Sequence, residues 1–146
     1  MGETIRIAMD DGFEMPCYHA IPTGQRRGGV VLVQEIFGIT DHIRELCDEY
    51  AADGYEVISP ALFDRIEPGL ELSYSGADWE RAVRIARDEQ PIERSLEDTA
   101  ACIDWIAARG GPTFIETLTY RYADHAVNMG RVLLDRGGEV DEWKKR

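Results

Sequence analysis

The amino-acid sequence predicts an α/β domain over residues 1–110, with a β-hairpin followed by a strand–helix–strand unit in a parallel sheet. Three patterns predict it. Two segments of alternating apolar and polar residues come first, an uninterrupted apolar run follows them, and apolar residues then recur at helical spacing. A chain of 146 residues buries about 68–70% of its unfolded surface, so a packed core is expected.

The hairpin is predicted from two strands, Thr4–Met9 and Phe13–Ile21. Their alternation is typical of strands with one buried face. Asp11 and Gly12 lie between them, and an Asp-Gly pair between alternating runs is a strong hairpin signal because both residues tolerate the backbone of a tight turn.

The strand–helix–strand unit follows. Val30–Gln34 is continuously apolar until its last residue, as in strands that are covered on both faces. A helix is predicted over Asp41–Ala52, with Thr40 as its N-cap and Gly54 just beyond its end. Tyr55–Ser59 is the second strand, which makes a βαβ unit of two parallel strands, and its crossover should be right-handed.

Two further helices are predicted over Ala77–Asp88 and Glu93–Ala108. The buried stripe of the second helix is expected to consist of Leu96, Ala100, Ile103 and Ile106. Phe114–Thr119 is predicted as an outer strand next to Val30–Gln34. Its far edge would be open, and open edges favour pairing with a second copy of the chain.

The formal net charge of −12 and the pI near 4.6 argue against nonspecific binding to nucleic acid or to anionic membranes. No apolar run is long enough to span a bilayer, and the N-terminus has no secretory signal pattern. Cys17, Cys47 and Cys102 are odd in number and widely spaced, which fits buried thiols in a reducing cytoplasm.

No metal site and no cofactor is predicted. No two histidines have metal-ligand spacing, and neither a phosphate loop nor a dinucleotide fingerprint is present. His19 and His42 are expected to be surface or half-buried side chains.

Residues 1–108 resemble the N-terminal half of a dienelactone hydrolase, a branch of the α/β hydrolases. The resemblance rests on the order of the elements and on one specific sequence motif, Gln34-Glu35-Ile36-Phe37-Gly38. Two later motifs support the resemblance: Pro60-Ala61-Leu62-Phe63 and Cys102-Ile103-Asp104-Trp105. The resemblance implies a partial α/β-hydrolase fold, a three-layer sandwich with helices on both faces of the sheet.

The same resemblance implies roles for four residues. The family hydrolyses small esters and lactones with a cysteine or serine nucleophile, histidine and aspartate, and backbone N–H groups hold the oxyanion. Ile36 would supply one of these N–H donors, and Glu35 would be an accessory carboxylate near the nucleophile. Phe37 would contact the substrate, and Arg81 is a weaker candidate for binding a substrate carboxylate.

The nucleophile is missing from the sequence. The nucleophile elbow has the form Gly-x-Ser/Cys-x-Gly because its strained turn accepts only small neighbours. Ser73 and Ser75 lack the first glycine, while Ser95 and Cys102 fall inside a predicted helix. The later strands that would carry the aspartate and histidine are not found either.

Residues 111–146 have a different character. The run Gly111-Pro112-Thr113 to Tyr120-Arg121-Tyr122 is similar to the alpha subunit of thiamine-diphosphate-dependent 2-oxoacid dehydrogenases. His125 falls where that family has a histidine near the cofactor. The Gly-Asp-Gly motif of that family is absent and Ala126 replaces its usual serine, so no thiamine cofactor is predicted. A seam between two family fragments is expected near Arg109–Pro112.

Three functional hypotheses follow. The first is a dienelactone hydrolase-like protein that lacks activity on its own, with a small ester or lactone as its ligand. The second is a non-catalytic module that binds a small molecule or a protein partner on the same scaffold. The third is a chimeric fragment that joins a hydrolase half to a dehydrogenase tail.

Overall fold

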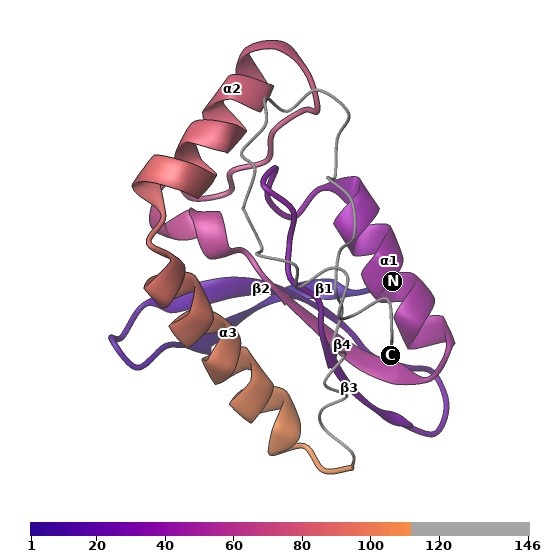
Figure 1. Ribbon diagram of the computed structural model, residues 1–146. Coiled ribbons are helices and arrows are strands. Elements are labelled where there is room, and N and C mark those ends of the chain that lie inside the picture. The colour runs from indigo at the N-terminus through magenta and orange to yellow at the C-terminus, as the bar shows by residue number, and fades with distance from the viewer. Residues whose placement is uncertain (112–146) are drawn as a thin grey trace, which may run out of the picture. The chain divides into compact units, whose positions relative to one another are not determined.

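The computed structural model describes residues 1–111, which form a four-stranded mixed sheet in the order β1-β2-β4-β3 (Figure 1). β1 (Glu3–Ala8) and β2 (Glu14–Ala20) are antiparallel. β4 (Tyr55–Pro60) pairs antiparallel with β2 and parallel with β3 (Gly28–Val31). The predicted hairpin and parallel pair are therefore confirmed.

The hairpin turn is a three-residue loop from Asp10 to Gly12. Phe13 and Met9 close it through a 2.9 Å hydrogen bond, in which the Met9 N–H donates to the Phe13 carbonyl. The Gly12 N–H donates to the Met9 carbonyl, and Gly12 has a φ of +82°. Three-residue hairpin loops commonly end in a left-handed residue, and Gly12 of the Asp-Gly pair supplies it here.

The parallel unit follows the prediction with two corrections. α1 spans Asp41–Ala52 as expected, but the Thr40 hydroxyl makes no capping hydrogen bond. β3 ends at Val31, three residues before the predicted end. Pairing stops soon after this point: the Leu32 N–H still donates to the Ile58 carbonyl over 2.9 Å, and the chain then leaves the sheet.

Four helical segments complete the described residues. The 3₁₀-helix η1 (Leu62–Arg65) follows β4, and α2 (Gly76–Arg84) continues directly into the π-helical turn η2 (Ile85–Glu89). α3 spans Ile92–Ala107. None of the helices among residues 1–111 is long and apolar enough to cross a lipid bilayer. The predicted strand Phe114–Thr119 and His125 lie outside the described residues.

The sheet lies between α1 on one face and α3 on the other (Figure 1). Successive residues of β4 point to opposite faces. Val57 belongs to the core under α1, with Ile43 and Cys47, whereas Ile58 belongs to the core under α3, with Cys102 and Ile106. This arrangement is the three-layer sandwich that the resemblance implied.

The buried stripe of α3 differs from the predicted one. The helix buries Asp98, Cys102 and Ile106 at four-residue spacing, while Leu96 is 63% exposed. Ala100 is also exposed, and Ile103 is half-buried. The reason is that the Asp98 carboxylate pairs with the mostly buried Arg65, so the helix turns inward the face that carries Asp98 and not the purely apolar stripe.

A second buried carboxylate, that of Glu56 on β4, is hydrogen-bonded to three basic side chains. It is hydrogen-bonded to His19 Nε2 at 2.9 Å, Arg26 Nε at 2.7 Å and Arg109 Nε at 2.6 Å. Arg26 also donates to the carbonyls of Ile106 and Gly110 at the C-terminal end of α3. His19 is 4% exposed, so the expectation of a surface or half-buried histidine was wrong: β2 is an inner strand, and Glu56 provides the polar partner.

Candidate active-site turn

The residues Glu35 to Gly38 form a tight turn after β3. The Gly38 N–H donates to the Glu35 carbonyl over 3.3 Å. Gly38 has a φ of +87°, and a Cβ at this position would overlap the Leu70 carbonyl oxygen. Both the backbone conformation and the close approach of the Leu70 carbonyl therefore require glycine at the end of the Gln34–Gly38 motif.

Phe37 anchors the turn to a segment more than thirty residues later. Its carbonyl accepts the Leu72 N–H at 2.9 Å, and its side chain is 4% exposed. The Phe37 ring lies 4.3 Å from the Tyr74 ring and 5.6 Å from the Trp79 ring, measured between centroids. The predicted substrate-contacting residue is thus part of a cluster of three aromatic rings.

Glu35 points its carboxylate at the same segment. The Tyr74 hydroxyl donates to Glu35 Oε2 at 2.8 Å. The Thr40 hydroxyl lowers the pKa of Tyr74, but partial burial and the negative charge of Glu35 raise this pKa by more, so the phenol is neutral at pH 7. A neutral phenol is a hydrogen-bond donor, and it fixes one oxygen of an otherwise exposed carboxylate.

The N–H of Ile36 is not used by the hydrogen bonds that hold the turn. These bonds employ the N–H groups of Gly38 and Leu72 and the carbonyls of Glu35 and Phe37. The Ile36 side chain is half-buried and packs against the core under α3. Among residues 1–111 no hydrogen-bond acceptor is assigned to the Ile36 N–H, and an oxyanion donor needs a fixed backbone with such an N–H.

Gln34 is a residue that the sequence reasoning missed. Its side chain is 9% exposed, and its Nε2 donates to the Glu35 carbonyl over 3.2 Å. Its Oε1 has no hydrogen-bond partner among residues 1–111. The signal was available in the sequence, because a glutamine at the end of an apolar strand is a polar group that must find partners.

Arg81 lies on α2 and forms an ion pair with Glu67, with 2.5 Å between Nη2 and Oε2. The guanidinium is 33% exposed. In this structure, the charge of Arg81 is therefore directed to a carboxylate of the protein, and it ties α2 to the loop that precedes Leu70.

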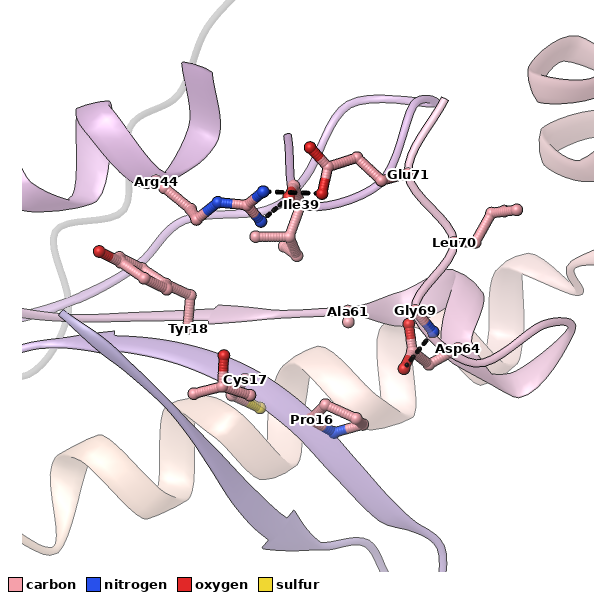
Figure 2. Close-up of a pocket in the computed structure, with 11 residues that line it drawn as sticks. Pro16, Cys17, Tyr18, Ile39, Arg44, Ala61, Asp64, Gly69, Leu70 and Glu71 are labelled. Carbon is pink, nitrogen blue, oxygen red and sulfur yellow. Dashed lines mark hydrogen bonds and ion pairs between the residues drawn. The ribbon is translucent and has the colours of Figure 1, made fainter. Parts of the chain in front are cut away.

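A pocket of about 140 Å³ lies beside the turn, where the 69–71 loop meets α1 and β2 (Figure 2). Arg44 and Glu71 face each other there at 2.7 Å, and Asp64 accepts the Gly69 N–H at 3.1 Å. Partial burial raises the pKa of Asp64. The lining residues come from separate segments without a local pattern, so no sequence motif indicates this pocket.

Metal chemistry has no support among residues 1–111, where no three His, Cys, Asp or Glu side chains gather into a possible metal site. The three cysteines are free thiols and are fully buried. Of the serines, Ser59 is buried, and Ser73 donates its hydroxyl to Asp78 at 2.7 Å. Within residues 1–111, the Glu35 carboxylate is hydrogen-bonded to the Tyr74 hydroxyl and to none of these groups.

The chain is similar in sequence and in structure to known proteins. The sequence model of the dienelactone hydrolase family matches residues 15–117. The chain is 32% identical over 131 residues to a protein of Azospirillum brasilense and 47% identical over 103 residues to one of Escherichia coli K12. Both carry the provisional name carboxymethylenebutenolidase.

These matches cover 88% and 68% of this chain but 51% and 36% of the relatives, so the chain spans about half or less of their length. The match over 88% of the chain and the family match both run through Arg109–Pro112, where the sequence analysis expected a seam. A solved structure from Klebsiella pneumoniae, provisionally assigned as a dienelactone hydrolase, is 30% identical with a TM-score of 0.56. That likeness covers 76% of this chain and 45% of the other.

Proposed function

Because the chain belongs to the dienelactone hydrolase family, we propose that its Glu35 turn is the ligand-binding half of an ester or lactone site. We further propose that the 146-residue chain binds such a ligand without completing its hydrolysis. The observation that carries the proposal is the intact turn: Gly38, Phe37 and Tyr74 hold it in place, and within the described part of the chain the Ile36 N–H has no acceptor.

The turn suits a carbonyl or carboxyl ligand for two reasons. Its backbone is fixed before any ligand arrives, so an N–H donor at Ile36 would lose little entropy on binding. Tyr74 and Trp79, which pack against the buried Phe37 ring, offer exposed aromatic surface beside the turn. The names of the relatives make a carboxymethylenebutenolide-type lactone the first ligand to test.

The proposed lack of turnover rests on the absence of a nucleophile. Residues 103–146 contain neither serine nor cysteine, and no earlier serine or cysteine stands in an elbow pattern. The three thiols are fully buried, which keeps them away from a substrate at the turn. Covalent acyl transfer requires such a group next to a base.

The test uses the full chain with 4-nitrophenyl acetate and an unsaturated butenolide lactone. We expect no turnover above buffer. Turnover that survives repurification and disappears in Glu35→Ala would overturn the proposed inactivity. Glu45→Ala is the matched control, because Glu45 is an exposed carboxylate on α1.

Binding is tested separately by thermal unfolding. A ligand that binds only the folded state raises the melting temperature, and we expect the lactone to do so in the wild type and in Glu45→Ala but less in Glu35→Ala. Arg81→Ala tests whether this arginine leaves Glu67 to meet a carboxylate on the ligand. Equal shifts in all variants would place the ligand elsewhere.

The second candidate function is a non-catalytic interaction module. It is favoured by the same combination, a family scaffold with an intact turn and no nucleophile. No lactone-induced shift in melting temperature, together with no turnover, would favour this function over ligand binding.

A further inference from the structure

Cys17 on β2 and Cys102 on α3 bring two thiols into contact inside the core under α3. Their Sγ atoms are 3.9 Å apart, and both residues are 0% exposed. The two positions are 85 residues apart in the sequence. The proposed ester or lactone site does not use this pair, and the sequence spacing does not reveal it.

The distance is close to that of a disulfide. A disulfide has an S–S length of about 2.05 Å, so the sulfur atoms would have to approach by about 2 Å in total. The third thiol, of Cys47, belongs to the other core, under α1. The fold therefore selects one of the three possible pairings.

The same burial makes the pair slow to react in the folded protein. Contact with Cys102, burial and the nearby charge of Asp98 all raise the pKa of the Cys17 thiol far above its ordinary value. The thiolate, not the thiol, attacks disulfides, so a folded and reduced chain exchanges slowly. A formed disulfide would be shielded from reductants for the same reason.

We propose that Cys17 and Cys102 are a latent disulfide pair, which closes when the reduced chain folds in the presence of a small-molecule disulfide. One thiolate attacks the small disulfide and releases one small thiol. The second thiolate attacks the resulting mixed disulfide and releases another. The protein loses two hydrogens and two electrons, and the oxidant becomes two small thiols.

The link would connect β2 to α3 and close a loop of 85 positions. Cross-linking restricts the unfolded chain, so a link over a long loop stabilises the folded state provided that it causes little strain. In the reducing cytoplasm predicted from the composition, the two thiols stay reduced. Oxidising conditions would convert the pair into a covalent tie between sheet and helix.

The experiment refolds the reduced, urea-unfolded full chain in a mixture of reduced and oxidised glutathione. The product is alkylated, digested and mapped by mass spectrometry. We expect a Cys17–Cys102 peptide pair, alkylation at Cys47, and a melting temperature at least about 5 °C above that of the reduced protein. A native-like circular dichroism spectrum shows that the mapped product is folded.

Cys47→Ala is expected to keep the link, and Cys102→Ala to abolish both the link and the rise in melting temperature. If Cys102→Ala fails to fold, the wild-type peptide map still decides the question. Three alkylated thiols in the refolded protein, or a link that includes Cys47, would overturn the proposal.

Discussion

The carboxylate of Asp98 and the guanidinium of Arg65 face each other through two hydrogen bonds of 2.6 and 2.7 Å. Asp98 is 1% exposed on α3, and the Arg65 side chain on η1 is 13% exposed. Arg65 also reaches Asp11 in the hairpin loop, at 2.8 and 3.2 Å, and lies over the ring of Phe13. One arginine thus joins the hairpin, η1 and α3.

Replacing Asp98 should be costly. We expect Asp98→Ala to lower the free energy of unfolding by about 2–3 kcal/mol, because it removes two charge-assisted hydrogen bonds of a mostly buried arginine and leaves it only the Asp11 carboxylate. Urea unfolding at pH 7 measures this. The control is Glu97→Ala, which removes an exposed ion pair with Arg94 and should cost less than about 1 kcal/mol. Equal effects of the two substitutions would contradict the assignment.

Gly38→Ala should destabilise the protein more than Gly69→Ala. Both glycines have positive φ, +87° and +71°, but only at Gly38 would a Cβ meet the Leu70 carbonyl. The conformational cost of about 1–2 kcal/mol is shared, whereas the steric cost is specific to Gly38. Urea unfolding of the two variants separates these effects, and a Gly69→Ala loss as large as that of Gly38→Ala would refute the steric argument.

The stability of the protein should fall below about pH 4.5 partly because of Glu56. Burial alone would raise the pKa of Glu56, but hydrogen bonds from His19, Arg26 and Arg109 lower it by more. Since the folded-state pKa is the lower one, the unfolded chain takes up the proton first as the pH falls. The stabilisation is therefore present above the ordinary pKa and is lost as the pH falls through the folded pKa.

Glu56→Gln tests this dependence directly. Its free energy of unfolding should change less between pH 5 and pH 3 than that of the wild type, whatever its value at pH 7. Urea unfolding at several pH values measures both slopes. Parallel curves for the two proteins would show that Glu56 does not contribute to the acid sensitivity.

The thiols of the folded and reduced protein should react slowly with Ellman's reagent. Burial raises the pKa of Cys47 to about 11, and all three cysteines are fully buried. At pH 8 we expect labelling about a hundredfold slower than that of glutathione, and fast labelling of three thiols in urea. Stoichiometric labelling of one native thiol at the rate of glutathione would reopen a catalytic role for it.

The chain should also associate as its concentration rises. Among residues 1–111, β3 pairs only with β4 and its residues Gly28–Val31 carry no charge, and the strand predicted over Phe114–Thr119 beside it would leave an open outer edge of its own. The opposite edge strand, β1, carries Glu3 and Arg6, which discourage pairing. Light scattering over a concentration series should show a mass above that of the monomer. A constant monomer mass would contradict the prediction.

The local elements were readable from the sequence because their signals are local. The Asp-Gly turn, the helix Asp41–Ala52 and its terminal Gly54 all depend on residues within a few positions of one another. The stripe of α3 was misjudged because Asp98 is buried by a partner 33 positions away. No periodicity of apolar residues reports such a pair.

The candidate site was only half readable for the same reason. The Gln34–Gly38 motif indicated Glu35, Ile36 and Phe37 as site residues because they are contiguous. Tyr74, which holds the Glu35 carboxylate, lies 39 positions away in an exposed loop without a regular pattern. Arg81 was a weak candidate for binding a substrate carboxylate, and the sequence has no pattern that indicates its ion pair with Glu67.

The contact between Gly38 and Leu70 determines which residues must be moved together when this site is grafted onto another protein. A graft of the Gln34–Gly38 motif alone would carry the Glu35 carboxylate. It would leave behind the Leu70 carbonyl, the Leu72 N–H and the Tyr74 hydroxyl, which contact the turn and hold its shape. The smallest portable unit is therefore discontinuous: a short turn and residues 70–74, moved together. A host scaffold must present two loops at matching separation, which makes helix–sheet frameworks better recipients than single hairpins.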